Sequence, residues 1–415
     1  MIAEILSTGD EICSGAIIDS NSAHIAEKLI ELDIDVTRHI CVGDDLAALT
    51  AILREIAKRA EICVVTGGLG PTRDDLSAEA AAEAADTGLE KNPQAVAYLE
   101  GFFKKFNRHA SESDYKQAVL PKGAVPLFNA RGTAPGFSLT IGKCRFYFMP
   151  GIPLEMTAML TEQVLPDIQA RLQAPDQFRR IRTLSAFGLP EARVNDRMAD
   201  ISEHFPNIRY GLLARFPLIY IKLITGGKDP DQLPADLEKA VSWVGEKLGD
   251  YVFSTTGRSM ESEVAQQLHC QGATVAVAES CTGGLVAHML TNVSGSSDFF
   301  LLSAVTYANS AKTDMLGVPP GIIEKHGAVH EETARLMAEG VRQAAGADYG
   351  ISTSGIAGPT GGTEEKPVGT VCIGIAGAGH ASGERFHSPF RERLANKQVF
   401  AVLALNVLRK NLMAK

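Results

Sequence analysis

The chain has 415 residues, of which 45% are hydrophobic and 21% charged, and its formal net charge is −9. The composition is ordinary for a globular protein and excludes disorder of the whole chain, while the length predicts two or three domains. The acidic balance disfavours a non-specific nucleic-acid binder, which would carry a basic surface, but it permits a phosphorylated small molecule in a local pocket.

Seven cysteines are scattered along the chain without a CxxC pair, which argues against a disulfide framework and favours a reducing compartment. Residues 1–6 lack the basic and long apolar regions of a signal peptide and are typical of a first strand. The apolar run at 399–408 is too short and too interrupted to span a bilayer. We therefore expect a cytoplasmic protein without a membrane partner.

The first segment, residues 1–172, alternates apolar runs with helical patterns. Strands are predicted at 2–6, 36–42 and 61–66, and helices at 22–32 and 46–60. A hairpin turning at Gly142 is predicted at 138–149, followed by a helix at 153–172. This alternation is typical of a parallel sheet in an α/β domain.

The second segment, residues 173–252, opens at the candidate linker Ala174-Pro175-Asp176. Strands are predicted at 179–184 and 218–224, and helices at 191–201 and 235–248. These elements make a small α+β module without a pattern that points to chemistry. We interpret it as a spacer or a dimerisation element, because function has to be argued from a site.

The third segment, residues 253–415, alternates helices and strands again. Helices are predicted at 260–270, 282–292, from 309 onward, at 331–345 and at 394–412. Strands are predicted at 273–278, 299–307, 348–354 and 368–376. The order predicts a second α/β domain.

A glycine-rich stretch follows the third strand of the first segment: Thr66-Gly67-Gly68-Leu69-Gly70-Pro71-Thr72-Arg73-Asp74-Asp75. The backbone N–H groups of such a loop before a helix suit a phosphate or pyrophosphate. The candidate phosphate-binding residues are Thr66, Gly67, Gly68, Gly70 and Thr72.

Acidic residues follow each of the three strands of the first segment. A carboxylate repels phosphate by itself, so these acids indicate a divalent cation such as Mg²⁺ or Mn²⁺. Because parallel strands end at one edge of a sheet, we expect the acids to converge; singly, each aspartate is also explained as a helix N-cap. The candidate metal ligands are Asp10, Glu11, Asp44, Asp74 and Asp75.

In the third segment, the stretch Ala278-Glu279-Ser280-Cys281-Thr282-Gly283-Gly284 joins a strand to a helix. Unpaired backbone N–H groups at a helix start bind phosphate or a developing oxyanion. The alternative is that Ser280 or Thr282 only caps the helix.

Further along, Gly295-Ser296-Ser297 precedes a strand whose end is Thr306-Tyr307-Ala308-Asn309-Ser310-Ala311-Lys312. A lysine whose pKa is lowered by burial, relayed through a tyrosine, can turn a serine hydroxyl into a nucleophile. The alternatives are a solvated surface lysine and a core tyrosine with a satisfied hydroxyl.

A loop of small residues, 353–362, lies between two strands and is followed by Glu365-Lys366-Pro367-Val368-Gly369-Thr370. Ligands bind at strand ends of open α/β sheets, and glycines allow close approach of the backbone. Lys366 is then placed to meet a phosphate. The alternative is a plain flexible turn, but such a turn does not need the two prolines and the lysine that this stretch contains.

With these motifs together, the chain resembles the CinA family, competence/damage-inducible protein A, over essentially its whole length. Its C-terminal part resembles the nicotinamide-nucleotide amidohydrolases, which convert nicotinamide mononucleotide to nicotinate mononucleotide and ammonia. The matching stretches are 278–284, 295–297, 305–312, 327–329, 337–340, 355–359 and 366–370.

The resemblance implies roles for these residues. Ser297 is the leading nucleophile, Tyr307 and Lys312 activate it, and Ser280 orients substrate or water; the spacing leaves Ser280 open as a rival nucleophile. No metal or other cofactor is implied for this reaction. The implied substrate-binding residues are Glu279, Thr282, Gly283, Gly284, Asn309, Ser354, Gly355, Gly358, Lys366, Arg391 and Arg393.

Two positions depart from the family pattern. His330 stands where the family usually has serine, and we interpret it as a helix cap. Near the end, Gly-Asp-Arg is replaced by Ser388-Pro389-Phe390-Arg391-Glu392-Arg393, so either arginine can be the one that holds the phosphate.

The N-terminal half resembles the three-layer MoaB/MogA-like molybdopterin-binding fold through Asp19-Ser20-Asn21, Asn129, 132–136, 149–153, Glu155 and Met156. The resemblance implies metal-dependent hydrolysis of ADP-ribose here and a homodimer overall. The first hypothesis is thus a two-activity enzyme of pyridine-nucleotide salvage acting on small nucleotides. The others are a molybdopterin-binding protein and a non-catalytic adaptor of DNA uptake, although the absence of a basic stripe argues against direct DNA binding.

Overall fold

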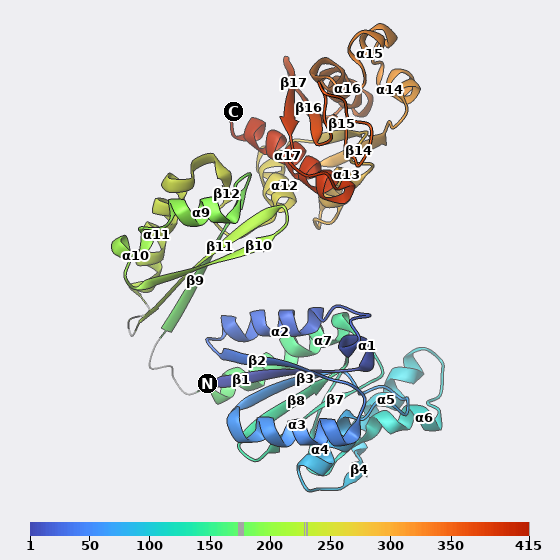
Figure 1. The fold of residues 1–415 in the computed structure, drawn as a ribbon. Coiled ribbons are helices and arrows are strands. Elements are labelled where there is room, and N and C mark those ends of the chain that lie inside the picture. The colour runs from blue at the N-terminus through green and yellow to red at the C-terminus, as the bar shows by residue number, and fades with distance from the viewer. Residues whose placement is uncertain (173–177, 228, 230, 415) are drawn as a thin grey trace. The chain divides into compact units, whose positions relative to one another are not determined.

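The computed structural model describes residues 1–172, 178–227, 229 and 231–414. The chain divides into two compact units, Met1–Asp176 and Gln177–Lys415, which are described separately (Figure 1). The candidate linker Ala174-Pro175-Asp176 lies outside the described residues. Within those residues, none of the helices has the length and apolar character needed to cross a membrane.

The first unit is built on a six-stranded sheet in the order β2-β1-β3-β8-β7-β6. The first four strands run parallel, and β7 and β6 are added antiparallel. A separate pair joins β4 to β5. The bounds are β1 (Ile2–Thr8), β2 (Asp35–Val42), β3 (Ile62–Thr66), β4 (Leu89–Lys91), β5 (Val119–Pro121), β6 (Val125–Leu127), β7 (Gly136–Ile141) and β8 (Cys144–Met149).

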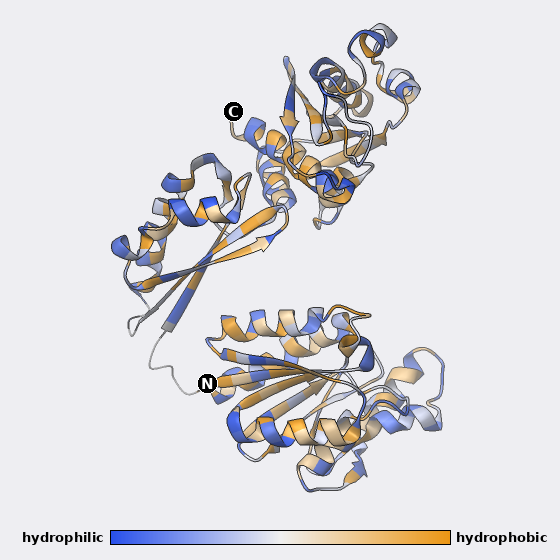
Figure 2. Cartoon of the chain, viewed as in Figure 1, coloured by the Kyte–Doolittle hydropathy of each residue, from blue (hydrophilic) through white to orange (hydrophobic). Residues whose placement is uncertain are grey.

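Helices cover both faces of this sheet, which gives three layers. Because side chains alternate along a strand, Phe146 and Phe148 of β8 enter one core while Tyr147 and Met149 enter the other. Figure 2 shows the apolar residues gathered in the central strands. The helices are α1 (Asp10–Cys13), α2 (Ser20–Glu31), α3 (Leu46–Arg59), α4 (Ser77–Ala84), α5 (Pro93–Lys105), α6 (Glu112–Tyr115), η1 (Lys116–Ala118), α7 (Pro153–Met159), η2 (Leu160–Val164) and α8 (Leu165–Arg171).

The helix predicted at 153–172 is interrupted. Between α7 and α8 the chain widens into a π-helical segment, η2. Pro166, early in α8, lacks a backbone N–H, and its ring conflicts with the carbonyl one turn earlier, so the regular hydrogen bonding cannot continue through this point.

The second unit begins with a four-stranded antiparallel sheet in the order β10-β11-β9-β12. Its strands are β9 (Phe178–Phe187), β10 (Ile208–Arg215), β11 (Leu218–Gly227) and β12 (Val252–Ser254). Its helices are α9 (Glu191–Arg197), α10 (Ile201–His204), α11 (Leu233–Leu248) and η3 (Gly249–Tyr251). The α+β prediction for this module is confirmed, although β10 is not foreseen.

The rest of the second unit is a five-stranded sheet in the order β14-β13-β15-β16-β17, with β14, β13 and β15 parallel. Its strands are β13 (Val275–Glu279), β14 (Phe300–Val305), β15 (Tyr349–Gly355), β16 (Thr370–Gly377) and β17 (His380–His387). Its helices are α12 (Met260–Gln271), α13 (Leu285–Thr291), η4 (Ser296–Asp298), α14 (Asn309–Leu316), α15 (Pro320–His326), α16 (Glu331–Ala345) and α17 (Arg393–Met413).

One core of this sheet contains residues of α12, α13 and α17, and the other contains residues of α14, α15 and α16. Leu218 of β11 and Phe253 of β12 also belong to the first of these cores. The middle module and the last segment therefore share buried apolar side chains. The predicted α/β fold class of the chain is confirmed.

Candidate functional sites

In the second unit, a buried lysine lies beside a serine. Lys312 of α14 is only 1% exposed. Its Nζ lies 3.3 Å from Ser280 Oγ, 2.8 Å from the Thr306 carbonyl oxygen and 3.2 Å from that of Tyr307. Ser280 follows β13, and Thr306 and Tyr307 follow its parallel neighbour β14, so these groups meet at the carboxyl edge of the sheet.

Burial lowers the pKa of Lys312, because the charged ammonium loses its hydration. A neutral amine has two N–H donors and one lone pair. The two carbonyl oxygens accept the two donors, which leaves the lone pair for the hydroxyl of Ser280. The arrangement thus suits a base that removes the serine proton.

The structure places Ser297 elsewhere. Ser297 lies in the exposed turn η4, which precedes β14, whereas Lys312 lies beyond the end of that strand. A strand of this length spans roughly 20 Å. Ser297 and Lys312 of one chain are therefore not in contact, contrary to the role that the resemblance implies for Ser297.

Tyr307 does not relay between Lys312 and a serine. Its side chain is 61% exposed, and its hydroxyl accepts a hydrogen bond from Arg393 Nη2 at 2.9 Å. Only its backbone carbonyl contacts the lysine. Both arginines are exposed, but Arg393 also donates from Nη1 to the Gly358 carbonyl at 3.1 Å. Of the two arginines, Arg393 is the one whose guanidinium is positioned by its neighbours.

Glu279 is a structural group rather than a substrate contact. It is fully buried, and its carboxylate accepts the N–H groups of Gly284, Val286 and Ala287 at 2.9–3.1 Å. The expectation that the start of α13 binds an anion is therefore wrong for these amides, because a side chain of the protein already occupies them. Gly283 and Gly284 have φ of 61° and 94°, which favour glycine.

Other predicted substrate-binding side chains are also held by internal hydrogen bonds. Thr282 pairs with Thr353 at 2.7 Å, Ser354 donates to the Ala328 carbonyl, and Lys366 donates to the His326 carbonyl.

The structure also places three other residues named from the sequence. Asn309 is exposed at the first position of α14. At Gly355, at the end of β15, a Cβ would lie 2.7 Å from the Thr370 carbonyl. His330 caps α16 by accepting the Glu332 N–H at 3.1 Å, as expected.

Two residues of this region were not foreseen from the sequence. The Thr306 hydroxyl is buried beside Lys312 and has no partner among the described residues. Asn396 donates to the carbonyls of Ala357 and Phe390, both at 2.9 Å, and so ties the 353–362 loop to the segment before Arg393. Thr306 lies within the motif around Tyr307, whereas Asn396 lies in an apolar helix that gives no such signal.

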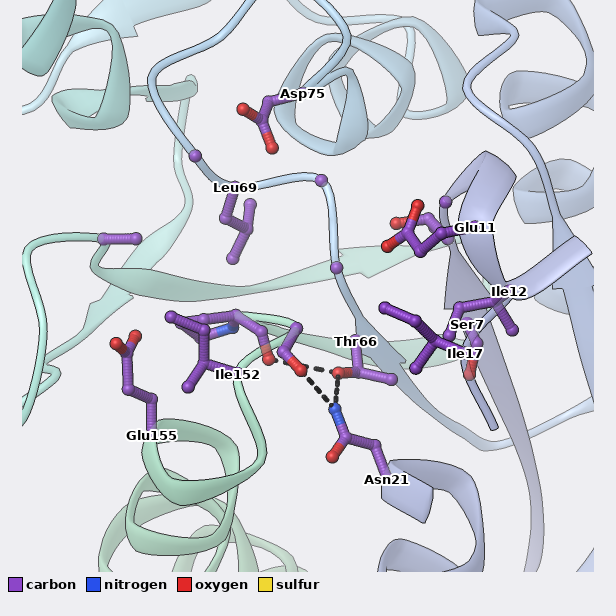
Figure 3. A pocket seen from close by; sticks show the side chains of 18 of the residues that line it. Ser7, Glu11, Ile12, Ile17, Asn21, Thr66, Leu69, Asp75, Ile152 and Glu155 are labelled. Atoms are coloured by element: carbon purple, nitrogen blue, oxygen red, sulfur yellow. Dashed lines mark hydrogen bonds between the residues drawn. The ribbon is translucent and has the colours of Figure 1, made fainter. Parts of the chain in front are cut away.

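The first unit contains a cavity of about 570 Å³ at the carboxyl ends of its parallel strands. Its lining mixes glycines, acids and apolar side chains, some of which are seen in Figure 3. Asp10 and Thr72 are not among the described residues that line it. The predicted residues that do line it are Glu11, Asp44, Thr66, Gly67, Gly68, Gly70, Asp74 and Asp75.

The glycine-rich loop is fixed tightly at its start. Gly67 has φ of 108°, and a Cβ there would lie 2.5 Å from the Thr8 carbonyl. The Thr66 hydroxyl donates to the Pro150 carbonyl and accepts from Asn21 Nδ2 at 2.9 Å (Figure 3). Asn21 Oδ1 is buried without a partner among the described residues, so it is a further candidate ligand contact, at a position that the sequence marked only as part of the resemblance.

The acids around this cavity do not converge as expected. Thr72 donates its hydroxyl to Asp74 and Asp75. Asp10 and Asp44 each accept the backbone N–H of the other, at 3.1 and 3.2 Å. These bonds join the acids in two pairs, Asp10 with Asp44 and Asp74 with Asp75, and Figure 3 shows Glu11 and Asp75 on separate walls. Among the described residues, no three His, Cys, Asp or Glu side chains form a group that could hold a metal ion.

The acids are nevertheless coupled electrostatically. The pKa of Asp44 is raised, first by burial and then by the negative charges of Asp10, Glu11 and Asp74. A cation in this cavity would relieve that repulsion, and carboxylate oxygens are suitable donors for a hard divalent ion. The donor set therefore fits Mg²⁺ chemically, although the acids are not gathered into a closed site.

Three families match the chain in succession. Residues 4–170 match the probable molybdopterin binding domain, residues 181–254 match the damage-inducible protein CinA KH domain, and residues 257–412 match the CinA C-terminal domain. A CinA-like protein of Desulfosudis oleivorans is 51% identical over 415 residues, and one of Geobacter metallireducens is 40% identical over 417 residues; both alignments cover 100% of each chain.

Solved structures match part of the chain. A CinA protein with unknown function from Thermoplasma acidophilum is 30% identical and covers 40% of this chain and 97% of its own, with a TM-score of 0.38. The competence/damage inducible protein CihA from Agrobacterium tumefaciens is 35% identical and covers 38% and 97%, with a TM-score of 0.36.

Proposed function

The chain belongs to the CinA family, and we propose that its C-terminal domain is an amidohydrolase that converts nicotinamide mononucleotide to nicotinate mononucleotide and ammonia. The observation that carries the proposal is the contact of buried Lys312 with Ser280. A general base adjacent to a hydroxyl is the arrangement that acyl transfer from an amide requires.

The reaction follows from this pair. Neutral Lys312 takes the proton of Ser280 as Oγ attacks the carboxamide carbon, and the protonated lysine then gives a proton to the leaving ammonia. Water attacks the resulting acyl ester with Lys312 again as base, which releases the carboxylate and restores the serine. The N–H groups of Cys281 and Thr282, which follow Ser280 in the chain, are candidate donors to the oxyanion.

The substrate phosphate needs a positive partner away from Ser280. Arg393 supplies a planar guanidinium that Tyr307 and Gly358 already orient. Arginine binds phosphate with two parallel hydrogen bonds, and this geometry favours Arg393 over Arg391 as the phosphate contact. No metal takes part in this scheme.

Two serine variants test the proposal. Ser280→Ala is expected to abolish ammonia release from nicotinamide mononucleotide, while Ser297→Ala, the matched control, retains most of it. Ammonia is measured with purified full-length protein, with and without a chelator, after circular dichroism shows that each variant is folded. Loss of activity in Ser297→Ala with retention in Ser280→Ala would overturn the assignment.

We also propose that the N-terminal cavity hydrolyses the pyrophosphate of ADP-ribose with a divalent cation. The support is the cavity volume, the glycine-rich loop and the carboxylates that line it. Mg²⁺ is commonly held by one or two carboxylates together with substrate phosphates, so a preformed cluster of three acids is not required. Direct titration with ADP-ribose and with a pterin distinguishes this activity from molybdopterin binding, the alternative for the same cavity.

A further inference from the structure

Two exposed cysteines of the first unit lie in contact. Cys13 is the last residue of α1, Cys41 lies near the end of β2, and their Sγ atoms are 3.2 Å apart. We propose that this pair is an oxidative modification site, at which a reversible disulfide joins α1 to the edge of the sheet.

The local structure allows the bond to form. A disulfide needs a sulfur separation of about 2.05 Å, so the two sulfur atoms have to approach by roughly 1 Å. Helix α1 has no buried residue, and it starts after Gly9, whose φ is 138°. Such a short, superficial helix can shift by this amount without disturbing a packed core.

The cross-link would act on one wall of the cavity. Glu11, Ile12 and Ile17, which lie on α1 or just after it, line the cavity (Figure 3). Cys41 lies three residues before Asp44, which lines the cavity just beyond the end of β2. The backbone already joins these two segments through the exchange between Asp10 and Asp44. A covalent bond between Cys13 and Cys41 adds a second, stronger tie and holds this wall in one position.

The redox step balances with a peroxide as oxidant. One thiolate attacks a peroxide oxygen, and the hydroxide that leaves takes up the proton lost by that thiol, which gives a sulfenic acid and water. The second thiol then displaces the hydroxyl as water and forms the disulfide. The two thiols lose two electrons and two protons in all, and hydrogen peroxide is reduced to two molecules of water. A dithiol reductant reverses the reaction.

The test treats the reduced full-length protein with hydrogen peroxide and maps its peptides by mass spectrometry. The expected product is one cross-linked peptide pair that contains Cys13 and Cys41 and is lighter by two hydrogens. Amide hydrogen exchange in residues 10–18 is expected to slow in this product and to recover after reduction. Neither readout depends on the activity proposed for the cavity.

Cysteine variants supply the controls. Cys13→Ser and Cys41→Ser should each abolish the cross-link, whereas Cys270→Ser, which removes another exposed cysteine, should leave it intact. Over-oxidation of either cysteine without a cross-link would overturn the proposal. So would disulfides that form only between two chains, which a non-reducing gel detects.

Discussion

The two candidate sites differ in how much of their chemistry the protein assembles by itself. In the second unit, Lys312 and Ser280 are in contact, and the backbone satisfies the remaining donors of the lysine. In the first unit, a large cavity exists, but its acids are joined in separate pairs, and no three of them form a group that could hold a metal ion among the described residues. A base and nucleophile pair can thus be complete without ligand, whereas a cation site can depend on oxygens of the substrate to complete its coordination.

The largest expected effect tests the preassembled site. Lys312→Met preserves much of the buried volume but removes the base, so ammonia release should fall by about 10³-fold, within the range for loss of a general base. Lys325→Met, at an exposed position, is the matched control. If a folded Lys312→Met variant still released ammonia, Lys312 would not be the base, and the second unit would not hold a preassembled site.

The pH dependence follows from the same lysine. Only the neutral amine can accept the serine proton, and burial lowers the pKa of Lys312 below the ordinary 10.5. In the wild-type enzyme, kcat/KM should therefore rise with pH through that lowered pKa and then level off. A profile that declines over this range would contradict the role of Lys312 as base.

The next effect concerns the site that is not preassembled. A chelator should abolish ADP-ribose hydrolysis, and Asp44→Asn should reduce it by about 10²-fold, because loss even of a group that only supports a metal ligand typically costs about 10- to 100-fold. Ammonia release should not respond to either treatment. Release of AMP and ribose 5-phosphate from ADP-ribose measures the hydrolysis, and equal sensitivity of both activities to the chelator would contradict the assignment of the cation to the first unit alone.

A smaller effect is expected at the phosphate contact. Arg393→Gln should raise the KM for nicotinamide mononucleotide about tenfold or more, since a charged hydrogen bond contributes about 1.5–3 kcal/mol. Arg391→Gln is the matched control and should change KM little. Steady-state kinetics measure both values of KM. A larger rise in KM for Arg391→Gln than for Arg393→Gln would identify Arg391 as the phosphate contact.

The smallest effect is on stability. Glu279→Gln replaces one acceptor oxygen by an NH₂ group that faces backbone donors. The free energy of unfolding should fall by about 1–3 kcal/mol, which urea denaturation followed by circular dichroism can measure. An unchanged stability would show that the carboxylate is not needed at the start of α13 and would reopen that position for an anion.

Much of the fold could be predicted from apolar patterning. The α3 stripe of Ile52, Leu53 and Ile56 and the alternating hairpin before Met149 both give clear signals. The strand β17, His380–His387, is largely exposed and has no apolar alternation, and α4 is mostly alanine, so neither produces a periodic signal. These elements are fixed by tertiary packing instead.

The candidate site could be predicted in part. Ser280 follows its strand and Ser297 precedes the next parallel strand, so the order of elements already places the two serines at opposite edges of the sheet. The predicted order of strands and helices therefore favours Ser280 as the partner of Lys312. The capping by Glu279 could not be foreseen, because it depends on how the chain turns back over the preceding side chain.

The buried side chains shared by the middle module and the last segment have a consequence for heat unfolding. Leu218 and Phe253 belong to strands of the antiparallel sheet, yet they pack in the core that α12 and α17 enclose. If either layer melts, the other loses apolar contacts, so the two should absorb heat in one cooperative transition. A calorimetric scan of the whole chain should then show two peaks rather than three, one for each compact unit.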